Sequence, residues 1–266
     1  MTTQPIIRFC GVGKTFARAT EPVLEGIDLD VSPGEMVALI GPSGCGKSTL
    51  LNVLAGLTDV TAGTIELARQ DLRSAYVFQN PRLLPWRSVR RNVEFGLEQG
   101  GFSSQERSHR ARRALELVHL GEHGDKYPHQ LSGGMQQRAA LARGLALEPA
   151  LLLLDEPFGA LDALTRSYLQ EELLGIVRRS EATTLLVTHD IDEALLLADR
   201  VVVMSSRPAR IRKVFDVPFG KNRTLDESLS HPQFVPLRRQ IRALLRPEVA
   251  ASDPTLQDHP AEAVDA

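Results

Sequence analysis

Apolar residues along the chain fall into short runs separated by longer periodic stretches. Residues 23–31 (VLEGIDLDV) alternate apolar and polar side chains, which predicts a half-buried strand. Residues 36–40 (MVALI) form a continuous apolar run, typical of a strand buried on both faces. Similar short runs predict further strands at Ser74 to Phe78, Leu151 to Leu154, Thr184 to Val187 and Val201 to Met204.

Stretches with helical spacing lie between several of these strands. After Gly41 the apolar residues repeat as on one face of a helix, at Leu50, Leu51, Leu54 and Leu57. Strands that alternate with helices predict an α/β fold with a mainly parallel sheet.

Residues 82–145 have a different pattern, with little strand character. Two helical stripes stand out in this span: Val89, Val93 and Leu97, then Leu115, Val118 and Leu120. A loop at 100–104 separates them. We therefore expect a helical lobe inserted into the sheet domain.

The C-terminal region combines apolar residues with arginines. The apolar residues at helical spacing are Phe234, Leu237, Ile241, Leu244 and Leu245, with Arg238, Arg239, Arg242 and Arg246 between them. This pattern predicts an amphipathic helix over 233–246 that docks on the protein, with a nucleic-acid patch as the alternative. Residues 247–266 contain no Lys or Arg and are rich in Pro, Ala and acids, which predicts a disordered tail.

Composition narrows the class of protein only slightly. A hydrophobic share of 42% is ordinary for a globular domain, and a formal net charge of −2 gives no reason to expect nucleic-acid binding. The two cysteines, Cys10 and Cys45, form no disulfide framework, which favours a reducing compartment. We see no signal-peptide pattern, and the apolar runs are far shorter than the ~20 residues of a membrane span. Any role at a membrane would be that of a soluble partner.

A glycine-rich loop follows the buried strand at 36–40. Residues 41–48 (GPSGCGKS) fit the pattern G-x-x-x-x-G-K-[ST] between a strand and a helix, so a phosphate-binding loop is favoured over a turn that binds nothing. Its N–H groups would surround the phosphates, Lys47 would reach the β and γ groups, and the Ser48 hydroxyl would ligate Mg²⁺. Cys45 is interpreted as a small filler rather than a redox switch. The predicted nucleotide contacts are Gly41, Pro42, Ser43, Gly44, Cys45, Gly46, Lys47, Ser48 and Thr49.

Two adjacent carboxylates end the strand LLLLDE at 151–156. Because neighbouring strand residues point to opposite faces, Asp155 and Glu156 should have different roles. Asp155 is predicted to hold Mg²⁺, and Glu156 to polarise the attacking water. The alternative, that both acids only end a strand, is disfavoured by the phosphate-binding loop upstream.

Two more polar residues follow predicted strands. Gln79 ends the strand at 74–78, and His189 follows the strand at 184–187, so both belong to the edge of the sheet where α/β folds bind ligands. Gln79 is predicted to reach Mg²⁺ or the lytic water. His189 is predicted to bind the γ-phosphate and to position Glu156, although a lone histidine is more often a surface or core residue.

Residues 131–138 (LSGGMQQR) hold no acid, metal ligand or nucleophile. A serine before paired glycines predicts a helix N-terminus that meets an anion. Which site supplies that anion is not given by the stretch itself.

Together these motifs resemble an ATP-binding subunit of the ABC transporter family, over about residues 1–220. In family order they are the loop at 41–49, Gln79, LSGGMQQR at 131–138, LLLLDE at 151–156, ALD at 160–162 and His189. LSGGMQQR is the most specific, because other P-loop ATPases lack it. The resemblance implies a P-loop (RecA-like) core with an antiparallel β subdomain and an inserted helical subdomain, over residues 1–232.

The same resemblance implies a head-to-tail dimer, either of two copies of this chain or of this chain with a paired ATPase subunit, with two ATP molecules between the subunits. Ser132, Gly133 and Gly134 would then bind the γ-phosphate held by the other copy's Lys47, and Asp162 would cross the interface. Phe16, upstream of the first predicted strand pair, resembles the aromatic residue that stacks on adenine; a core phenylalanine is the alternative. Met135 departs from the glutamine that the family often has there.

A narrower likeness is to the importer ATPases for nitrate, sulfonate and taurine. It rests on residues 79–98, 155–166, 188–195 and 203–211. In that group the segment with Leu84, Pro85 and Trp86 receives a coupling helix of the membrane subunit; for Trp86 a core aromatic is the alternative. The likeness implies transmembrane permease subunits, an indirect solute-binding protein, and a place at the cytoplasmic face of the membrane.

Two other functions share these motifs. An exporter ATPase is one, and the segment at Pro85 and Trp86 with the arginine-rich end favours an importer over it. A soluble ABC ATPase of DNA repair, ribosomes or cluster assembly is the other. The chain lacks the long coiled-coil insertion of the repair type and the second ATPase domain of the ribosome type.

Overall fold

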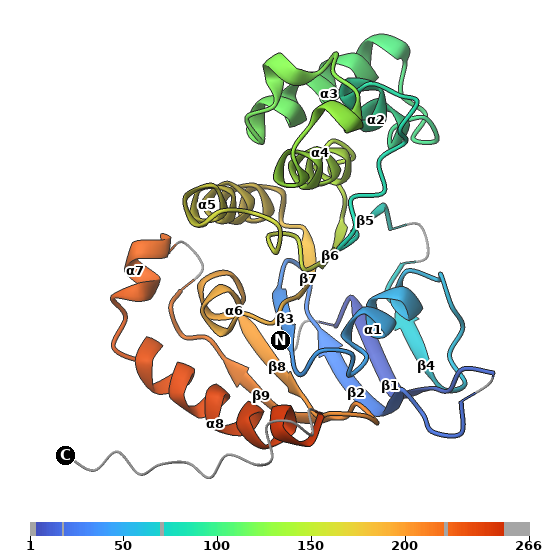
Figure 1. Cartoon of the computed structure of the whole chain (residues 1–266). Helices are drawn as coiled ribbons and strands as arrows, with labels where there is room; N and C mark the ends of the chain where they lie inside the picture. The colour runs from blue at the N-terminus through green and yellow to red at the C-terminus, as the bar shows by residue number, and fades with distance from the viewer. Residues whose placement is uncertain (1–3, 18, 70–71, 221–222, 253–266) are drawn as a thin grey trace.

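Two β-sheets and a lobe of helices make up the molecule in this computed structural model, which describes residues 4–17, 19–69, 72–220 and 223–252 (Figure 1). The strands are β1 (Ile7–Lys14), β2 (Leu24–Val31), β3 (Met36–Ile40), β4 (Ala62–Leu67), β5 (Ser74–Val77), β6 (Leu151–Asp155), β7 (Thr183–Val187), β8 (Arg200–Met204) and β9 (Ile211–Asp216). The α-helices are α1 (Lys47–Leu54), α2 (Val89–Phe95), α3 (Ser104–Leu117), α4 (Gly133–Leu145), α5 (Ala163–Ser180), α6 (Ile191–Leu197), α7 (Leu225–Leu229) and α8 (Phe234–Ser252). Two 3₁₀ turns, η1 (Gly121–His123) and η2 (Pro128–Gln130), complete the described elements.

The larger sheet has six strands in the order β5-β6-β7-β3-β8-β9. Its pairs are parallel except for β8 with β9, which is antiparallel, so the expected mainly parallel sheet is confirmed. Every residue of β3, β6 and β7 is buried, as expected for strands covered on both faces.

The central strands divide the interior into two cores. Met36, Ala38 and Ile40 of β3 face a core shared with the lobe, α5, α6 and α8, whereas Val37 and Leu39 face a core shared with α1 and the smaller sheet. This alternation is the two-residue period of a strand. Helix α1 is thereby fixed between the two sheets, with its amino end at the carboxyl end of β3.

The smaller sheet is antiparallel, in the order β2-β1-β4, and confirms the expected antiparallel subdomain. Only β2 was predicted from the hydrophobic pattern; β1 and β4 were missed. The ladder of β1 is irregular between Phe9 and Val12, and β4 is largely exposed, so neither has a clean alternation. Phe16 lies between β1 and β2, upstream of the strands predicted at 23–31 and 36–40, as expected.

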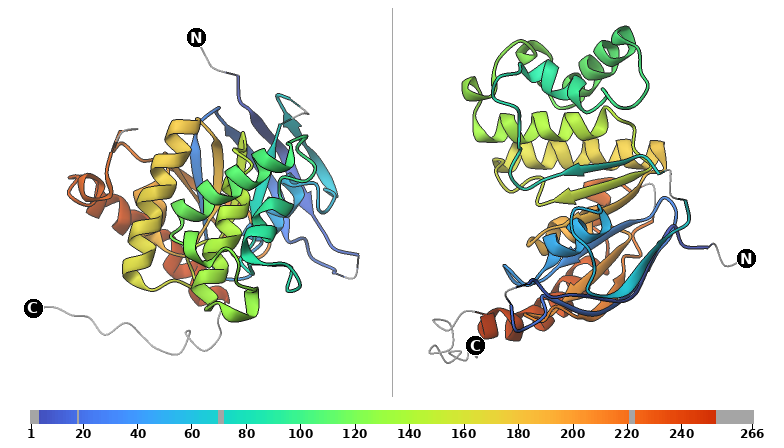
Figure 2. Two further views of the ribbon diagram at one scale, coloured as in Figure 1. Left: turned by 90° about the horizontal axis from the view of Figure 1, so that it is seen from above. Right: turned by 90° about the vertical axis from the view of Figure 1, so that its right-hand side faces the viewer.

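Helices α2, α3 and α4 pack together into the expected lobe, which stands above α5 and the sheets in both side views (Figures 1 and 2). Both predicted apolar stripes are buried within it. The lobe begins irregularly, because α2 starts only at Val89, after the N-cap Ser88. Buried Asn92 explains this: its amide nitrogen donates to the carbonyls of Leu84, Arg87 and Ser88, which fixes a non-helical turn there.

The C-terminal helix docks on the protein through its apolar face, as predicted. Phe234 and Ile241 of α8 are buried in the main core, and Arg238 pairs with Asp192 of α6 at 2.8 Å. The helix is longer than predicted, ending at Ser252 instead of 246, which corrects the first part of the predicted tail. The alanines at 250 and 251 favour this extension. The rest of the predicted tail, 253–266, lies outside the described residues.

Candidate active site

The glycine-rich loop joins the carboxyl end of β3 to the amino end of α1. Gly46 is the N-cap of α1 with φ of 130°, and a Cβ there would lie 3.0 Å from side-chain atoms of both Val23 and Leu24. No other residue type adopts this conformation in so little space. The loop is therefore held tightly against β2, with its backbone turned around the start of α1.

Lys47 lies inside this loop. It is only 5% exposed, and its ammonium group donates to the carbonyls of Gly41 and Pro42, both at 2.8 Å. These acceptors are neutral, so the loop carries the positive charge that attracts an anion. Cys45 beside it is buried, and burial raises the pKa of its thiol, which fits a filler and not a reactive thiolate.

Asp155 ends β6 and lies beside the first turn of α1. Its carboxylate accepts a hydrogen bond from the Ser48 hydroxyl at 2.9 Å and another from the Tyr76 hydroxyl at 3.4 Å. Burial raises the pKa of Asp155, and the Ser48 hydrogen bond opposes that shift. A hydroxyl and a carboxylate oxygen side by side form a donor set that suits Mg²⁺.

Tyr76 is a site residue that sequence reasoning missed. Burial and the charge of Asp155 raise the pKa of its phenol, so it remains a hydrogen-bond donor. In the sequence it is one aromatic residue within a predicted strand. Only the pairing of β5 with β6 brings it to Asp155.

Glu156 has different partners from those of Asp155. Its φ of 47° puts it in the left-handed region, where a side chain is strained. Its Oε2 accepts from the Gln79 amide at 2.9 Å and lies 3.4 Å from Nδ1 of His189. The structure therefore brings together the three residues predicted for water activation.

His189 is the solvent-exposed member of this group. Its side chain is 65% exposed, whereas that of Glu156 is 19% exposed. It follows β7, so it lies at the carboxyl edge of the sheet, next to the end of β6. An imidazole placed here can hold the carboxylate and still meet a ligand arriving from solvent.

LSGGMQQR forms the amino end of α4, which belongs to the lobe. Ser132 is the N-cap and accepts the Met135 N–H at 3.3 Å, and Gly133 and Gly134 are the first helical residues. The first turn contains no acidic residue, and Ser132 and Gly133 are exposed. This matches the predicted helix N-terminus open to an anion.

The ALD segment lies directly beside this helix end. A Cβ on Gly134 would come 3.2 Å from the Leu161 side chain, so glycine permits the close contact. Asp162 is exposed and caps α5 by accepting the Thr165 N–H at 3.0 Å, which lowers the pKa of its carboxyl. The predicted site residues thus form two groups: the sheet edge, and an exposed face with Ser132, Gly133, Gly134 and Asp162.

Two aromatic residues that were predicted to meet partners are exposed. Phe16 is 45% exposed, with the Lys14 ammonium 5.2 Å from the centre of its ring. Trp86 is 72% exposed and borders an open groove with Arg90 and Tyr127. The alternative of a core aromatic is therefore wrong for both residues.

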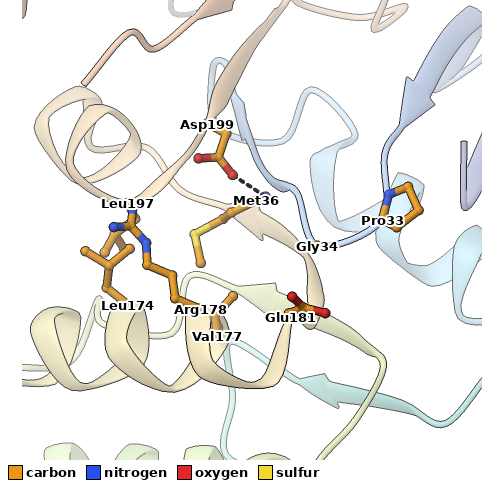
Figure 3. A pocket seen from close by; sticks show the side chains of 9 residues that line it. All are labelled: Pro33, Gly34, Met36, Leu174, Val177, Arg178, Glu181, Leu197 and Asp199. Carbon is orange, nitrogen blue, oxygen red and sulfur yellow. Dashed lines mark hydrogen bonds between the residues drawn. The ribbon is translucent and has the colours of Figure 1, made fainter. Parts of the chain in front are cut away.

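A cavity of about 360 Å³ lies elsewhere (Figure 3). It is lined by residues at the amino ends of β3, β7 and β8, where Asp199 accepts the Met36 N–H at 2.9 Å. None of the predicted site residues borders it. The residues predicted for catalysis and cation binding lie at the opposite, carboxyl edge of the sheet.

The described residues contain no group of three or more His, Cys, Asp and Glu that could hold a metal ion. A Mg²⁺ ion at Ser48 and Asp155 would therefore depend on further oxygens, such as those of a phosphate. Over the same part of the chain, no helix has both the length and the hydropathy that a bilayer crossing demands.

Comparison with known proteins places these features in one family. Residues 24–159 match the ABC transporter family. The nitrate import ATP-binding protein NrtC of Synechococcus elongatus is 46% identical over 82% of this chain, which spans only 34% of that protein's length. The taurine import ATP-binding protein TauB of Chromobacterium violaceum is 46% identical over 84% of this chain and 89% of its own.

The fold has matching solved structures. The dimeric post-hydrolysis structure of the ATP-binding cassette MJ0796, bound to ADP and Pi, superposes with a TM-score of 0.72 and 30% sequence identity. The match covers 79% of this chain and 98% of that one. It confirms the expected P-loop ATPase cassette fold with its inserted helical subdomain.

Proposed function

The chain belongs to the ABC transporter family and is an ATPase of that family, and we propose that it is the subunit that energises an importer of small solutes. The observation that carries this proposal is the polar cluster at the sheet edge, where Gln79 and His189 hold Glu156 while Ser48 holds Asp155. Water activation and cation binding have separate carboxylates there, an arrangement that suits ATP hydrolysis.

In the proposed reaction, water attacks the γ-phosphorus of ATP, the bond from this phosphorus to the β–γ bridging oxygen breaks, and ADP leaves. Lys47 and the loop N–H groups bind the phosphates, and Ser48, Asp155 and the Gln79 carbonyl would hold Mg²⁺. Glu156 accepts a proton from the attacking water, and His189 orients Glu156 and the γ-phosphate. Mg²⁺ neutralises charge on the phosphates when bound. Most of the rate acceleration comes from positioning and charge neutralisation.

The exposed face at the amino end of α4 is proposed to complete the site of a second copy. Ser132, Gly133 and Gly134 offer N–H groups to the γ-phosphate that the partner copy holds, and Asp162 crosses the interface. Two ATP molecules are thereby enclosed in a head-to-tail dimer. Closure is favoured because ATP makes these bonds only in the closed state.

The groove at Trp86 is the proposed contact with transmembrane permease subunits at the cytoplasmic face of the membrane. An aromatic side chain that is 72% exposed beside Arg90 and Tyr127 is suited to receive a partner helix. The names of the relatives support nitrate, taurine or a related small sulfonate or oxyanion as the solute. A solute-binding protein outside the membrane would deliver it.

The experiment is uptake by cells whose copy of this chain is deleted. Re-expression of the wild-type chain should restore uptake of one solute from a panel of nitrate, taurine and alkyl sulfonates. A matched Glu156→Gln chain, expressed equally, should restore none. If the deletion left the uptake of every solute unchanged, the importer assignment would be contradicted. The ATPase activity is tested separately, by ATP hydrolysis with the purified chain.

A further inference from the structure

The connection between β8 and β9 lies against the phosphate-binding loop. The Met204 carbonyl is only 3.0 Å from the position of a Cβ on Gly41, so the two backbones touch. From the same connection, Arg207 Nε donates to the Gly44 carbonyl at 2.8 Å. These residues are far apart in sequence, and no motif links them.

The hydrogen bond from Arg207 fixes the direction of one peptide group. Gly44 has φ of 70°, a conformation that glycine adopts freely, so by itself the Gly44–Cys45 peptide is easy to rotate. In a planar trans peptide the N–H points opposite to the C=O. With the Gly44 carbonyl turned to Arg207, the Cys45 N–H is turned into the loop, where it meets the Pro42 carbonyl at 3.3 Å.

The connection that carries Arg207 is itself anchored. The Ala209 N–H donates to the Val23 carbonyl at 2.9 Å, and the Ser205 hydroxyl donates to the Pro208 carbonyl at 3.0 Å. Arg210 also pairs with Glu25 at 2.8 Å, but both side chains are exposed, so this pair adds little to the anchoring. The backbone that carries Arg207 is therefore held in place by hydrogen bonds. The Arg207 side chain itself is exposed and contributes nothing to the core.

We propose that Arg207 is a positioning residue of the nucleotide site: it holds the Gly44–Cys45 peptide, and with it the turn that the Cys45 N–H closes on the Pro42 carbonyl, in the shape that receives the phosphates. This inference rests on the proposed function, since it assumes that the loop binds a nucleotide. Arg207 does not touch the phosphates. It acts through the carbonyl on the outer side of the loop.

The test compares Arg207→Ala with Arg210→Ala, which removes an arginine from the same turn without touching the loop. The affinity for a fluorescent ADP should fall roughly tenfold in Arg207→Ala, as for one charge-assisted hydrogen bond, and less than twofold in Arg210→Ala. Hydrogen exchange of the segment 43–46 in the nucleotide-free protein should be faster only in Arg207→Ala. The melting temperature of both variants should equal that of the wild type.

Equal affinity losses in the two variants would overturn the proposal, because they would indicate a general charge effect. Unchanged affinity and exchange in Arg207→Ala would also overturn it. A wild-type chain that binds no nucleotide would instead refute the proposed function. In that case the exchange experiment would still report whether Arg207 holds the loop.

Discussion

The sheet edge and the amino end of α4 both present backbone N–H groups, but their surroundings differ. At the edge, Lys47 is buried and both acids are held by hydrogen bonds from other elements. At α4, Ser132 and Gly133 are exposed, and the hydrogen bond of the cap is local. The sheet edge therefore has both acidic groups and a lysine for catalysis. The end of α4 has only backbone N–H groups, which can bind an anion that is held on another surface.

The two regions also differ in what their local conformations cost in folding free energy. The edge keeps a strained Glu156 and a buried lysine, features that cost free energy unless the surroundings enforce them. The α4 end has a favourable serine cap, and its unpaired N–H groups are hydrated at little cost. Strain is therefore concentrated at the catalytic half of the proposed site.

The largest effect should come from Glu156→Gln, which removes the proposed base and keeps its shape. Turnover of ATP should fall roughly a thousandfold, the scale of general-base catalysis, while ATP binding remains. Steady-state hydrolysis and equilibrium binding measure the two. Glu181→Gln, at the opposite end of the sheet, is the matched control. Full turnover by the Glu156→Gln chain would contradict the claim that the sheet edge, and not the end of α4, supplies the catalytic base.

The carboxyl group of Glu193 is buried near the sheet edge, and its titration measures how much this burial costs in folding free energy. It lies in the first turn of α6, hydrogen-bonded to Gln170 at 3.2 Å, and burial raises its pKa to about 7. The folded state thus binds this proton more tightly than the unfolded state does. The burial penalty is absent below about pH 4.5, grows as the pH rises from 4.5 to 7, and is complete above pH 7.

Glu193→Gln should therefore stabilise the protein at pH 8 by about 3 kcal/mol, and most of this gain should be lost at pH 5. Urea unfolding at both pH values measures it. A gain that is equal at pH 5 and pH 8 would show that the carboxyl does not titrate in this range.

Gln79→Ala should have a smaller effect, because Glu156 keeps its contact with His189 and the proposed Mg²⁺ site keeps Ser48 and Asp155. Losing this hydrogen bond should lower kcat roughly tenfold with little change in the KM for ATP. Asn80→Ala, one residue further along the exposed loop, is the control. A raised KM with unchanged kcat would place Gln79 in binding and not in positioning.

The elements that carry chemistry were predictable because short-range patterns encode them. Buried strands appear as apolar runs, as at β3 and β6, and the loop at 41–48 has fixed spacing. Contacts between distant segments left no such pattern: Tyr76 reaches Asp155, and Arg207 reaches Gly44, only because the chain folds. Exposed strand β4 and the far end of α8 lack periodicity strong enough to mark them.

The central claim is that one working site combines the sheet edge of one copy with the α4 end of another. Lys47→Ala removes phosphate binding at the sheet edge. Ser132→Arg blocks the amino end of α4 and should leave nucleotide binding by the monomer intact. Each variant alone should hydrolyse almost no ATP. Mixed in equal amounts, they should regain up to about a quarter of the wild-type rate, because half of the dimers then hold one intact site. A mixture as inactive as its separate components, with dimers present, would contradict the shared site.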